Sequence, residues 1–389
     1  MMLIALVVIV GIFQWMTSGV LLKPMNVSNL INQNAYVVIL AVGMLICILT
    51  GGNIDLAVGS VVALVGACAG TFIVTWGMNS YISVVLCLII GIIIGIWQGF
   101  WIAYVRIPAF IVTLSGQLVF RGLTLLILKG LTIAPFPQDF QTLSTGFIPD
   151  FIGGMFGYSE RPNITCLVLG AIIAVVYLIM QISARVKRKK KNYPVENILV
   201  TLLRVAIIGA AVIWLFYELA MYRGVPTVLI TLGIVLIVYA YITSKTVMGR
   251  HIYAIGGNEK AARLSGVKTN KMLFLAYVNM SFLAAIAGII FAARLNSASP
   301  QAGQSFELDA IGACYIGGAS AYGGIGTVGG ALIGALVMGV LNNGMSIMGI
   351  SSNAQQVVKG LVLLAAVAID VISKQKLLTP FLAKFKKAR

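Results

Sequence analysis

Long apolar runs recur along the chain at the length of a membrane-spanning helix. A helix that crosses the hydrocarbon core of a bilayer needs about 20 predominantly apolar residues, and polar residues, glycine or proline mark its ends. Windows of this kind predict long helices at residues 2–22, 35–50, 56–76, 81–105, 109–128, 162–182, 198–221, 226–244, 272–293, 328–348 and 354–373, and a shorter one at 309–322. The pattern therefore predicts an all-α, polytopic membrane protein with about ten transmembrane helices, or up to twelve if half-helices are counted.

These helices follow one another closely, so residues 1–389 are predicted to form a single transmembrane domain. The segment 129–161 is acidic and carries three prolines that stop helices, and we predict an external loop over the mouth of a pore. The basic segment 245–271 is predicted to be a cytoplasmic loop. A faint similarity between residues 106–115 and 223–233 suggests a duplicated half, which is a common plan among transporters.

The composition excludes a water-soluble protein. Hydrophobic residues make up 60% and charged residues 10% of the chain, whereas soluble domains contain about 25% charged residues. The net charge of +17 comes largely from the stretches 183–197, 245–271 and 374–389. Because lysine and arginine concentrate in cytoplasmic loops, all three stretches and both termini are predicted to be cytoplasmic. We expect these basic residues to contact membrane lipid and not nucleic acid.

Few residues in the chain can perform chemistry. The five cysteines occur singly in apolar runs and His251 is the one histidine, so we predict no metal site, no catalytic residues and no enzyme. The segment GIGTVG at 324–329 matches a dinucleotide-binding pattern, but no strand precedes it, and we interpret it as a helix break. The chain has no P-loop motif. It is therefore expected to hold no cofactor, and ATP would be hydrolysed by a partner subunit.

Asp55 is the only acidic or basic residue between positions 24 and 105. A carboxylate at the centre of a membrane helix costs roughly 2.5–3.5 kcal/mol on insertion scales, so it is expected to have a role. Gly51 and Gly52 should break the preceding helix, which favours Asn53 and Asp55 as caps of the next one. A role in binding a substrate or a proton is the alternative.

Polar residues near the predicted helix breaks are candidates for a solute pathway. Non-helical backbone at membrane depth is tolerated only where protein buries it or water surrounds it, so a pathway is expected to follow the breaks. The candidates are Gly52, Asn53, Asp55, Asn296, Gln304 and Asn342. Glu307 and Asp309 precede the short helix, and we interpret them as a cap at its outer end.

The basic loop contains the pattern of a short helix. Asn258 can cap the first turn, Glu259 lies at the positive end of the helix dipole, and Gly266 stops the helix. Ala261 and Ala262 would give it a small-residue face. Such a helix can fit a groove on a soluble partner, although the same pattern is also that of an ordinary connector between two spans.

This loop, GRHIYAIGGNEKAARLSG at 249–266, is similar to the coupling loop of bacterial ABC importer permeases. Three further segments resemble the monosaccharide branch of that family, namely GNIDLAVGS at 52–60, PAFIVTLS at 108–115 and ELDAIG at 307–312. The segment at 21–44 is most similar to multiple-monosaccharide and xylose-type permeases. The resemblance covers nearly the whole chain.

The resemblance implies a membrane-spanning permease subunit of an ATP-driven ABC importer for monosaccharides such as xylose, arabinose or galactose, in a bacterial inner membrane. It implies three kinds of partner: ABC ATPase subunits, an extracytoplasmic sugar-binding protein and a second permease subunit, preferably an identical copy. It assigns contact with the ATPase to Arg250, Asn258, Glu259, Ala261, Ala262, Arg263 and Gly266. The chain departs from the family at Asn53 and Ala57, where histidine and serine are usual.

Two other functions remain open from the sequence. The same architecture could carry another small solute, such as a branched-chain amino acid or a nucleoside. An ion-coupled secondary transporter would instead use Asp55 as its coupling residue. Such a transporter would need an ion gradient and no ATPase subunit.

Overall fold

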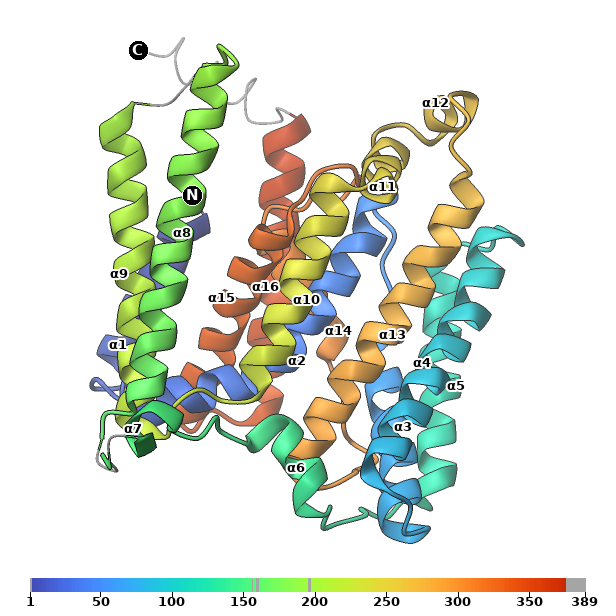
Figure 1. Ribbon diagram of the computed structural model, residues 1–389. Helices are drawn as coiled ribbons and strands as arrows, with labels where there is room; N and C mark the ends of the chain where they lie inside the picture. Colours follow the sequence, from blue (N-terminus) through green and yellow to red (C-terminus); the bar gives the residue numbers. More distant parts are fainter. Residues whose placement is uncertain (1, 156, 159–160, 195–196, 376–389) are drawn as a thin grey trace, which may run out of the picture.

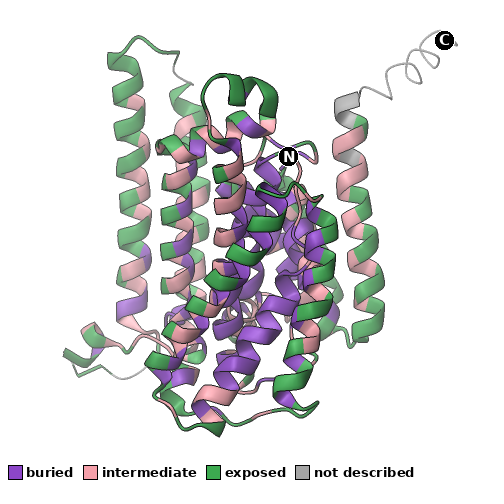
Figure 2. Ribbon diagram, turned by 90° about the vertical axis from the view of Figure 1, so that its right-hand side faces the viewer, coloured by how far each residue is buried: buried purple, intermediate pink, exposed green. Residues whose placement is uncertain are grey.

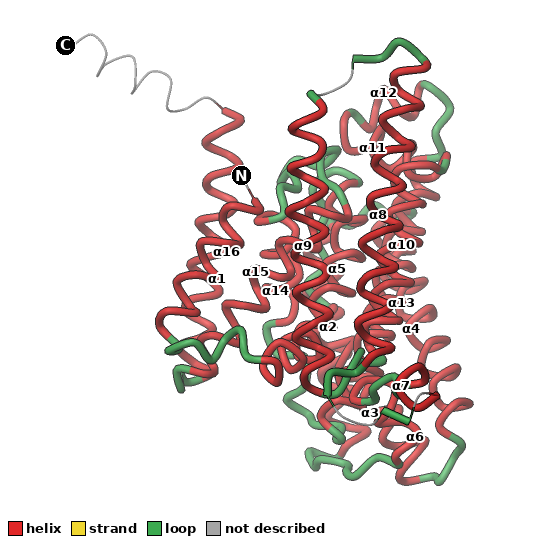
Figure 3. The backbone as a smooth tube through the Cα atoms, turned by 60° about the vertical axis from the view of Figure 1, so that its left-hand side comes forward, coloured by secondary structure: helices red, strands yellow, loops and turns green. Residues whose placement is uncertain are grey.

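The structure, a computed structural model, describes residues 2–155, 157–158, 161–194 and 197–375. These residues fold almost entirely into helices (Figure 1, Figure 3). In chain order the helices are α1 Met2–Met16, α2 Pro24–Leu49, α3 Val58–Gly70, the π-helix η1 Thr71–Thr75, α4 Ser80–Ala103, α5 Ala109–Leu128, α6 Gln138–Thr145, α7 Phe151–Met155, α8 Ile164–Lys190, α9 Ile198–Tyr222, α10 Val228–Lys245, α11 Val247–Gly257, α12 Glu259–Leu264, α13 Thr269–Leu295, α14 Phe306–Ile316, α15 Val328–Ile347 and α16 Ser352–Gln375.

The long helices run between two opposite faces of the molecule. α11 and α12 lie on one of them, which we call the α12 face, and α6 and α7 lie on the opposite one, the α6 face (Figure 1). Most of the basic stretch predicted at 374–389 lies outside the described residues.

Ten helices in the described part of the chain are long and apolar enough to cross a membrane, with α3 and η1 counted together. This confirms the predicted all-α polytopic class. Some predicted boundaries are wrong. The predicted helix 2–22 ends at Met16, and the predicted helix 35–50 begins at Pro24, because proline is favoured in the first turn of a helix. The predicted short helix 309–322 ends at Ile316, just before Gly317 and Gly318.

One four-part unit occurs twice, in opposite directions. α2 to α5 form the first copy and α13 to α16 the second. The packing partners match, because α13 packs against α2, α3 and α4 whereas α2 packs against α13, α14 and α15, and α5 packs on α3 as α16 packs on α14. Since α2 runs towards the α12 face and α13 runs away from it (Figure 1), the two copies form an inverted repeat, as in many transporters.

The duplication does not lie where the sequence similarity of residues 106–115 and 223–233 placed it. The first of these segments leads into α5, whose counterpart in the repeat is α16. The second leads into α10, which belongs with α8 and α9 to the part of the chain between the two copies. That similarity therefore reflects two proline-containing turns before apolar helices and not the repeat.

The second element of each copy is a broken span. In the first copy an irregular stretch at 50–57 precedes α3, and in the second copy an irregular stretch at 317–327 follows α14. Buried residues gather in the centre of the molecule, around α2, α3 and α13, whereas α8, α9 and α16 are largely exposed (Figure 2). The exposed surfaces of the outer helices are apolar, as lipid requires. The fold therefore encloses the two broken spans.

The predicted external loop 129–161 lies on the α6 face and contains α6 and α7, which the sequence did not predict. Asp150 fixes the start of α8, because its carboxylate accepts hydrogen bonds from the Ile164 N–H at 2.8 Å and from the N–H and hydroxyl of Thr165 at 3.0 and 2.7 Å. Partial burial acts to raise the pKa of Asp150, but these hydrogen bonds and one from the Gly153 N–H outweigh it and lower the pKa to about 2.

Candidate functional site

The loop between α10 and α13 forms two short helices, α11 and α12, on one face of the molecule (Figure 1). α12 projects from the α12 face, and α11 leads back towards the body of the molecule (Figure 1). The Asn258 side chain caps α12 by accepting a hydrogen bond from the Ala261 N–H at 3.0 Å, and Gly266 follows the helix with a φ of +85°. Both placements agree with the prediction. The predicted small-residue face is wrong, because Ala262 is buried and Ala261 is exposed.

Two side chains at this tip were not predicted. Leu264, at the end of α12, is 90% exposed, although burial of a leucine side chain is favourable in free energy. Arg106, in the turn between α4 and α5, forms an ion pair with Glu259 at 2.9 Å and also donates a hydrogen bond to Asn270. Arg250 and Arg263 are exposed on the same loop. The tip therefore offers an apolar side chain and basic groups to a partner, and Arg106 holds it against the first copy of the repeat.

The inner end of α11 contacts both broken spans through backbone atoms. A Cβ atom at Gly256 would overlap the Leu49 carbonyl oxygen and the Gly324 backbone, and a Cβ at Gly323 would lie 2.6 Å from the Gly51 backbone. The Gly324 N–H donates to the Leu49 carbonyl at 3.2 Å. Only glycine permits such an approach. We call this contact the glycine junction, formed by Gly51, Gly52, Gly256, Gly323 and Gly324.

A side chain reinforces the junction. The Tyr253 hydroxyl, on α11, donates a 2.6 Å hydrogen bond to the Gly326 carbonyl, in the irregular stretch after α14. The contact joins the loop to the second copy of the repeat, as Arg106 joins it to the first. A displacement of α11 would therefore move groups in both copies.

The helix break before Asp55 is present as predicted. α2 ends at Leu49, and Gly51 and Gly52 have φ values of +117° and +75°. Asp55 accepts a 2.8 Å hydrogen bond from the Ala57 N–H, which turns the chain just before α3. Asp55 is not the predicted cap of that helix, because Ala57 occupies the capping position and no side chain caps α3. The predicted capping role of Asn53 is wrong, because its amide donates back to Thr50 at the end of α2.

The start of α14 lies in the interior, which corrects the interpretation of its two acids as an outer cap. A Cβ at Gly59 in α3 would lie 2.9 Å from the Glu307 carboxylate, so the two short helices begin side by side. Asp309 is fully buried and its carboxylate pairs with the Lys359 ammonium of α16 at 2.9 Å. Arg121 of α5 donates to the carbonyls of residues 300 and 302. α5 and α16 thus each place one cation near the start of α14.

The remaining pathway candidates are dispersed. Asn296 ends α13 in the left-handed conformation and accepts a 2.7 Å hydrogen bond from the Phe136 N–H, so it anchors the external loop. Gln304 is exposed before α14. Asn342 lies on α15 and donates to Asp309 at 3.3 Å. Gly52 belongs to the glycine junction. The structure therefore assigns these four residues to four separate places.

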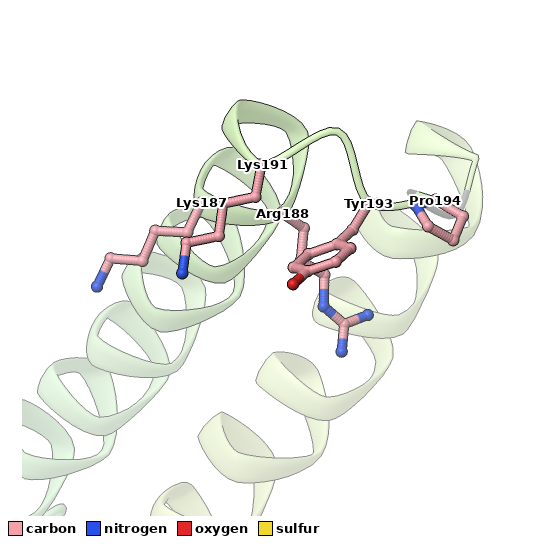
Figure 4. Close-up of a pocket in the computed structure, with 5 residues that line it drawn as sticks. All are labelled: Lys187, Arg188, Lys191, Tyr193 and Pro194. Carbon is pink, nitrogen blue, oxygen red and sulfur yellow. The ribbon is translucent and has the colours of Figure 1, made fainter.

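A different hollow lies at the turn between α8 and α9. It has a volume of about 520 Å³ and is lined by Lys187, Arg188, Lys191, Tyr193 and Pro194. Lys187 and Lys191 extend to the same side of α8, and Arg188 lies next to the Tyr193 ring (Figure 4). This hollow is remote from both broken spans (Figure 1). Its cations suit the phosphate groups of a lipid surface and not a solute path.

The described residues hold no group of three or more His, Cys, Asp or Glu side chains that could bind a metal ion. Three features distinguish this fold, namely the loop that contains α11 and α12, the two broken spans, and the glycine junction between them. Residues 26–367 match the family model described as branched-chain amino acid transport system / permease component.

The chain belongs to this permease family. It is similar to the xylose transport system permease protein XylH of Haemophilus influenzae, 38% identical over 97% of this chain and 96% of that protein. The ribose import permease protein RbsC of Escherichia coli is 35% identical over 95% of this chain and 92% of its own length. RbsC of Bacillus subtilis is 36% identical over 90% and 85%. No solved structure matches the chain.

Membership explains the architecture. A multi-pass transport permease needs a path through the bilayer, and this family is one of permeases and not of enzymes. The broken spans supply irregular backbone in the interior of the fold, where protein surrounds it. The glycine junction connects that backbone to the loop on the α12 face.

Proposed function

We propose that the chain is the membrane-spanning subunit of an ATP-driven ABC importer for monosaccharides such as xylose, arabinose or galactose. The xylose and ribose permeases to which it is similar over almost its whole length support this substrate class. The partners would be ABC ATPase subunits, an extracytoplasmic sugar-binding protein and a second permease subunit, in the simplest case an identical copy. The chain itself would hold no cofactor, because ATP would bind to the ATPase.

We further propose that the α12 face is cytoplasmic, in a bacterial inner membrane. The basic end of α8 and the basic loop around α11 and α12 lie on this face (Figure 1). Basic loops remain in the cytoplasm during membrane insertion. Both chain ends would then be cytoplasmic too, since α1 starts and α16 ends towards the same face.

The contact of α11 with both broken spans carries this proposal. An ATPase that engages Arg250, Asn258, Glu259, Ala261, Ala262, Arg263 and Gly266 would move α12 when it closes on ATP. α11 would pass the movement to the glycine junction, where backbone meets backbone and cannot yield by side-chain rotation. The two broken spans would shift together with the helices packed on them, and the transport path would change the face to which it opens.

The test is uptake of labelled xylose, arabinose and galactose by liposomes that contain the permease, its ATPase and its binding protein. Gly266→Trp should abolish ATP-driven uptake, because it blocks the docking surface. Gly130→Trp is the matched control, since Gly130 also has a positive φ and open space around it but lies after α5 on the α6 face. Glu259→Lys should also abolish uptake while the protein still inserts.

Uptake that persists without the ATPase and collapses with an ionophore would refute the proposal. The ion-coupled alternative would then take its place. Loss of transport in both tryptophan variants would show that backbone strain, and not docking, explains the effect.

A further inference from the structure

A polar cavity lies inside the fold between α2, α13, α15 and α16. It has a volume of about 410 Å³, within the roughly 300–1,000 Å³ of small-molecule sites. Most of the side chains that line it are polar, and they include Asn34, Arg294, Asn342, Ser346, Gln355 and Lys359. Polar side chains at membrane depth are costly and are usually retained for a solute path.

Two amide oxygens in this cavity have no hydrogen-bond partner among the described residues. They are Oδ1 of Asn34 and Oδ1 of Asn342. Asn34 is only 4% exposed, and its orientation is fixed because its Nδ2 donates to the Ala335 carbonyl at 2.8 Å. An unsatisfied buried acceptor costs about 1–3 kcal/mol. A ligand that donates hydrogen bonds would remove this cost.

One of the two cations that line the cavity is neutralised by a carboxylate. Lys359 pairs with Asp309, whose carboxylate also accepts hydrogen bonds from the Tyr36 hydroxyl at 3.0 Å and from Asn342. Arg294 donates a long hydrogen bond of 3.4 Å to the Gln33 carbonyl and keeps further donors. The cavity therefore presents donors and acceptors together.

This combination selects a solute class. An anion such as phosphate or a carboxylate could pair with Arg294, but it offers mostly acceptors and would leave the carbonyl oxygens of Asn34 and Asn342 without a donor. A branched-chain amino acid would need an apolar wall for its side chain, and Phe291 is the main apolar side chain here apart from Tyr36. A hydroxyl group both donates and accepts, as these amides require. Polyhydroxylated, uncharged solutes therefore match the lining best.

We propose that this cavity binds the monosaccharide during transport, with Asn34, Asn342 and Gln355 as hydrogen-bonding residues. The assignment rests on the proposed import function and names the site within it. The residues of α16 that face the cavity, Ser352, Gln355 and Lys359, recur at helical spacing on one side of that helix. α16 lies at the edge of the molecule (Figure 2). Ser346 and Ser352, on either side of the turn between α15 and α16, are exposed, so the cavity is open there.

The test uses the permease in liposomes with its ATPase and its binding protein. Gln355→Cys places a thiol in the cavity, and Gln138→Cys places one at the exposed start of α6, outside the cavity and outside the long apolar helices. All five native cysteines are buried, which keeps background labelling by a membrane-impermeant maleimide low. Xylose with its binding protein should slow labelling of Gln355→Cys about tenfold, as for a site that is about 90% occupied. Labelling of Gln138→Cys should not change.

A second measurement uses uptake. Gln355→Leu should lower the initial rate of xylose uptake about tenfold, and Gln355→Asn should restore most of it, because the hydrogen-bonding groups return. If the wild type imports xylose with ATP but neither Gln355→Leu uptake nor Gln355→Cys labelling responds, the cavity is not the sugar site and the proposed function stands. If leucine protects Gln355→Cys and xylose does not, the sugar assignment is wrong. A wild type that imports no monosaccharide contradicts the proposed function itself.

Discussion

The two neighbouring glycines at the end of α11 allow the glycine junction to be tested against a matched control. A Cβ at Gly256 would overlap the Leu49 carbonyl oxygen and the Gly324 backbone, whereas nothing lies within 4 Å of a Cβ at Gly257. Both residues are helical and neither has a positive φ. Replacement of each by alanine therefore changes the same backbone preference and differs in the contact alone.

The expected difference in the free energy of unfolding follows from the helix preference of alanine over glycine and from the overlap at Gly256. Alanine is favoured over glycine in a helix by roughly 0.5–1 kcal/mol, so Gly257→Ala should leave the free energy of unfolding unchanged or slightly raise it. Overpacking at Gly256 costs about 1–3 kcal/mol, because backbone atoms on the other side cannot rotate away. Gly256→Ala should therefore be about 1–3 kcal/mol less stable than Gly257→Ala.

Two measurements decide the matter. Equilibrium unfolding in mixed micelles gives the difference in stability, and ATP-driven uptake in liposomes gives the effect on coupling. We expect Gly256→Ala to lose most uptake while the ATPase still binds, and Gly257→Ala to keep it. Equal stability and equal uptake in the two variants would show that α11 does not press on the broken spans, and the proposed route of coupling would fail.

Three further predictions concern charged groups. Lys359→Met should destabilise the protein by about 3–5 kcal/mol, because it leaves the buried Asp309 carboxylate unpaired, and adding Asp309→Asn should recover most of that loss in the same unfolding assay. The half-exposed pair of Arg106 and Glu259 should show a coupling energy of only about 0.2–1 kcal/mol in a double-mutant cycle, and the value should fall at high salt. The pKa of Asp150 is lowered to about 2, so its stabilisation of the external loop should be complete above about pH 4 and lost as the pH falls towards 2; Asp150→Asn should abolish this step in protease protection of the loop, and an unchanged step would contradict the assignment.

The sequence predicts the helices well because each depends on a local property, a run of apolar residues of sufficient length. The cap at Asn258 and the break at Gly51 and Gly52 were predictable for the same reason, since the relevant residues are neighbours. The boundary between α1 and α2 was not, because the first part of α2 is polar, with Asn26, Ser28 and Asn34 among its residues, and hydropathy assigns such a stretch to a loop. The apolar residues 20–22 lie outside α1, although hydropathy joins them to that span.

Features that join distant segments escaped prediction. The glycine junction brings together backbone from three parts of the chain, and no local pattern records which glycines meet. The ion pair of Asp309 and Lys359 had a signal that could have been used. Lys359 is a basic residue inside the predicted span 354–373, and by the argument applied to Asp55 a charge at that depth requires a partner.

The carboxylates of the two broken spans lie near the start of one short helix, α3. Asp55 binds the Ala57 N–H at the start of α3. Glu307 reaches the first turn of the same helix from α14, beside Gly59. The positive end of a helix dipole stabilises nearby negative charge, so α3 gives both acids a structural role. An ion-coupled transporter would need a carboxylate that exchanges its ligand in each cycle, and Oδ2 of Asp55 has no hydrogen-bond partner among the described residues. The contact of α11 with the glycine junction gives a route for movement that does not need such an exchange. The energy for transport is then expected to come through the loop on the α12 face, as the proposed ATP-driven mechanism requires.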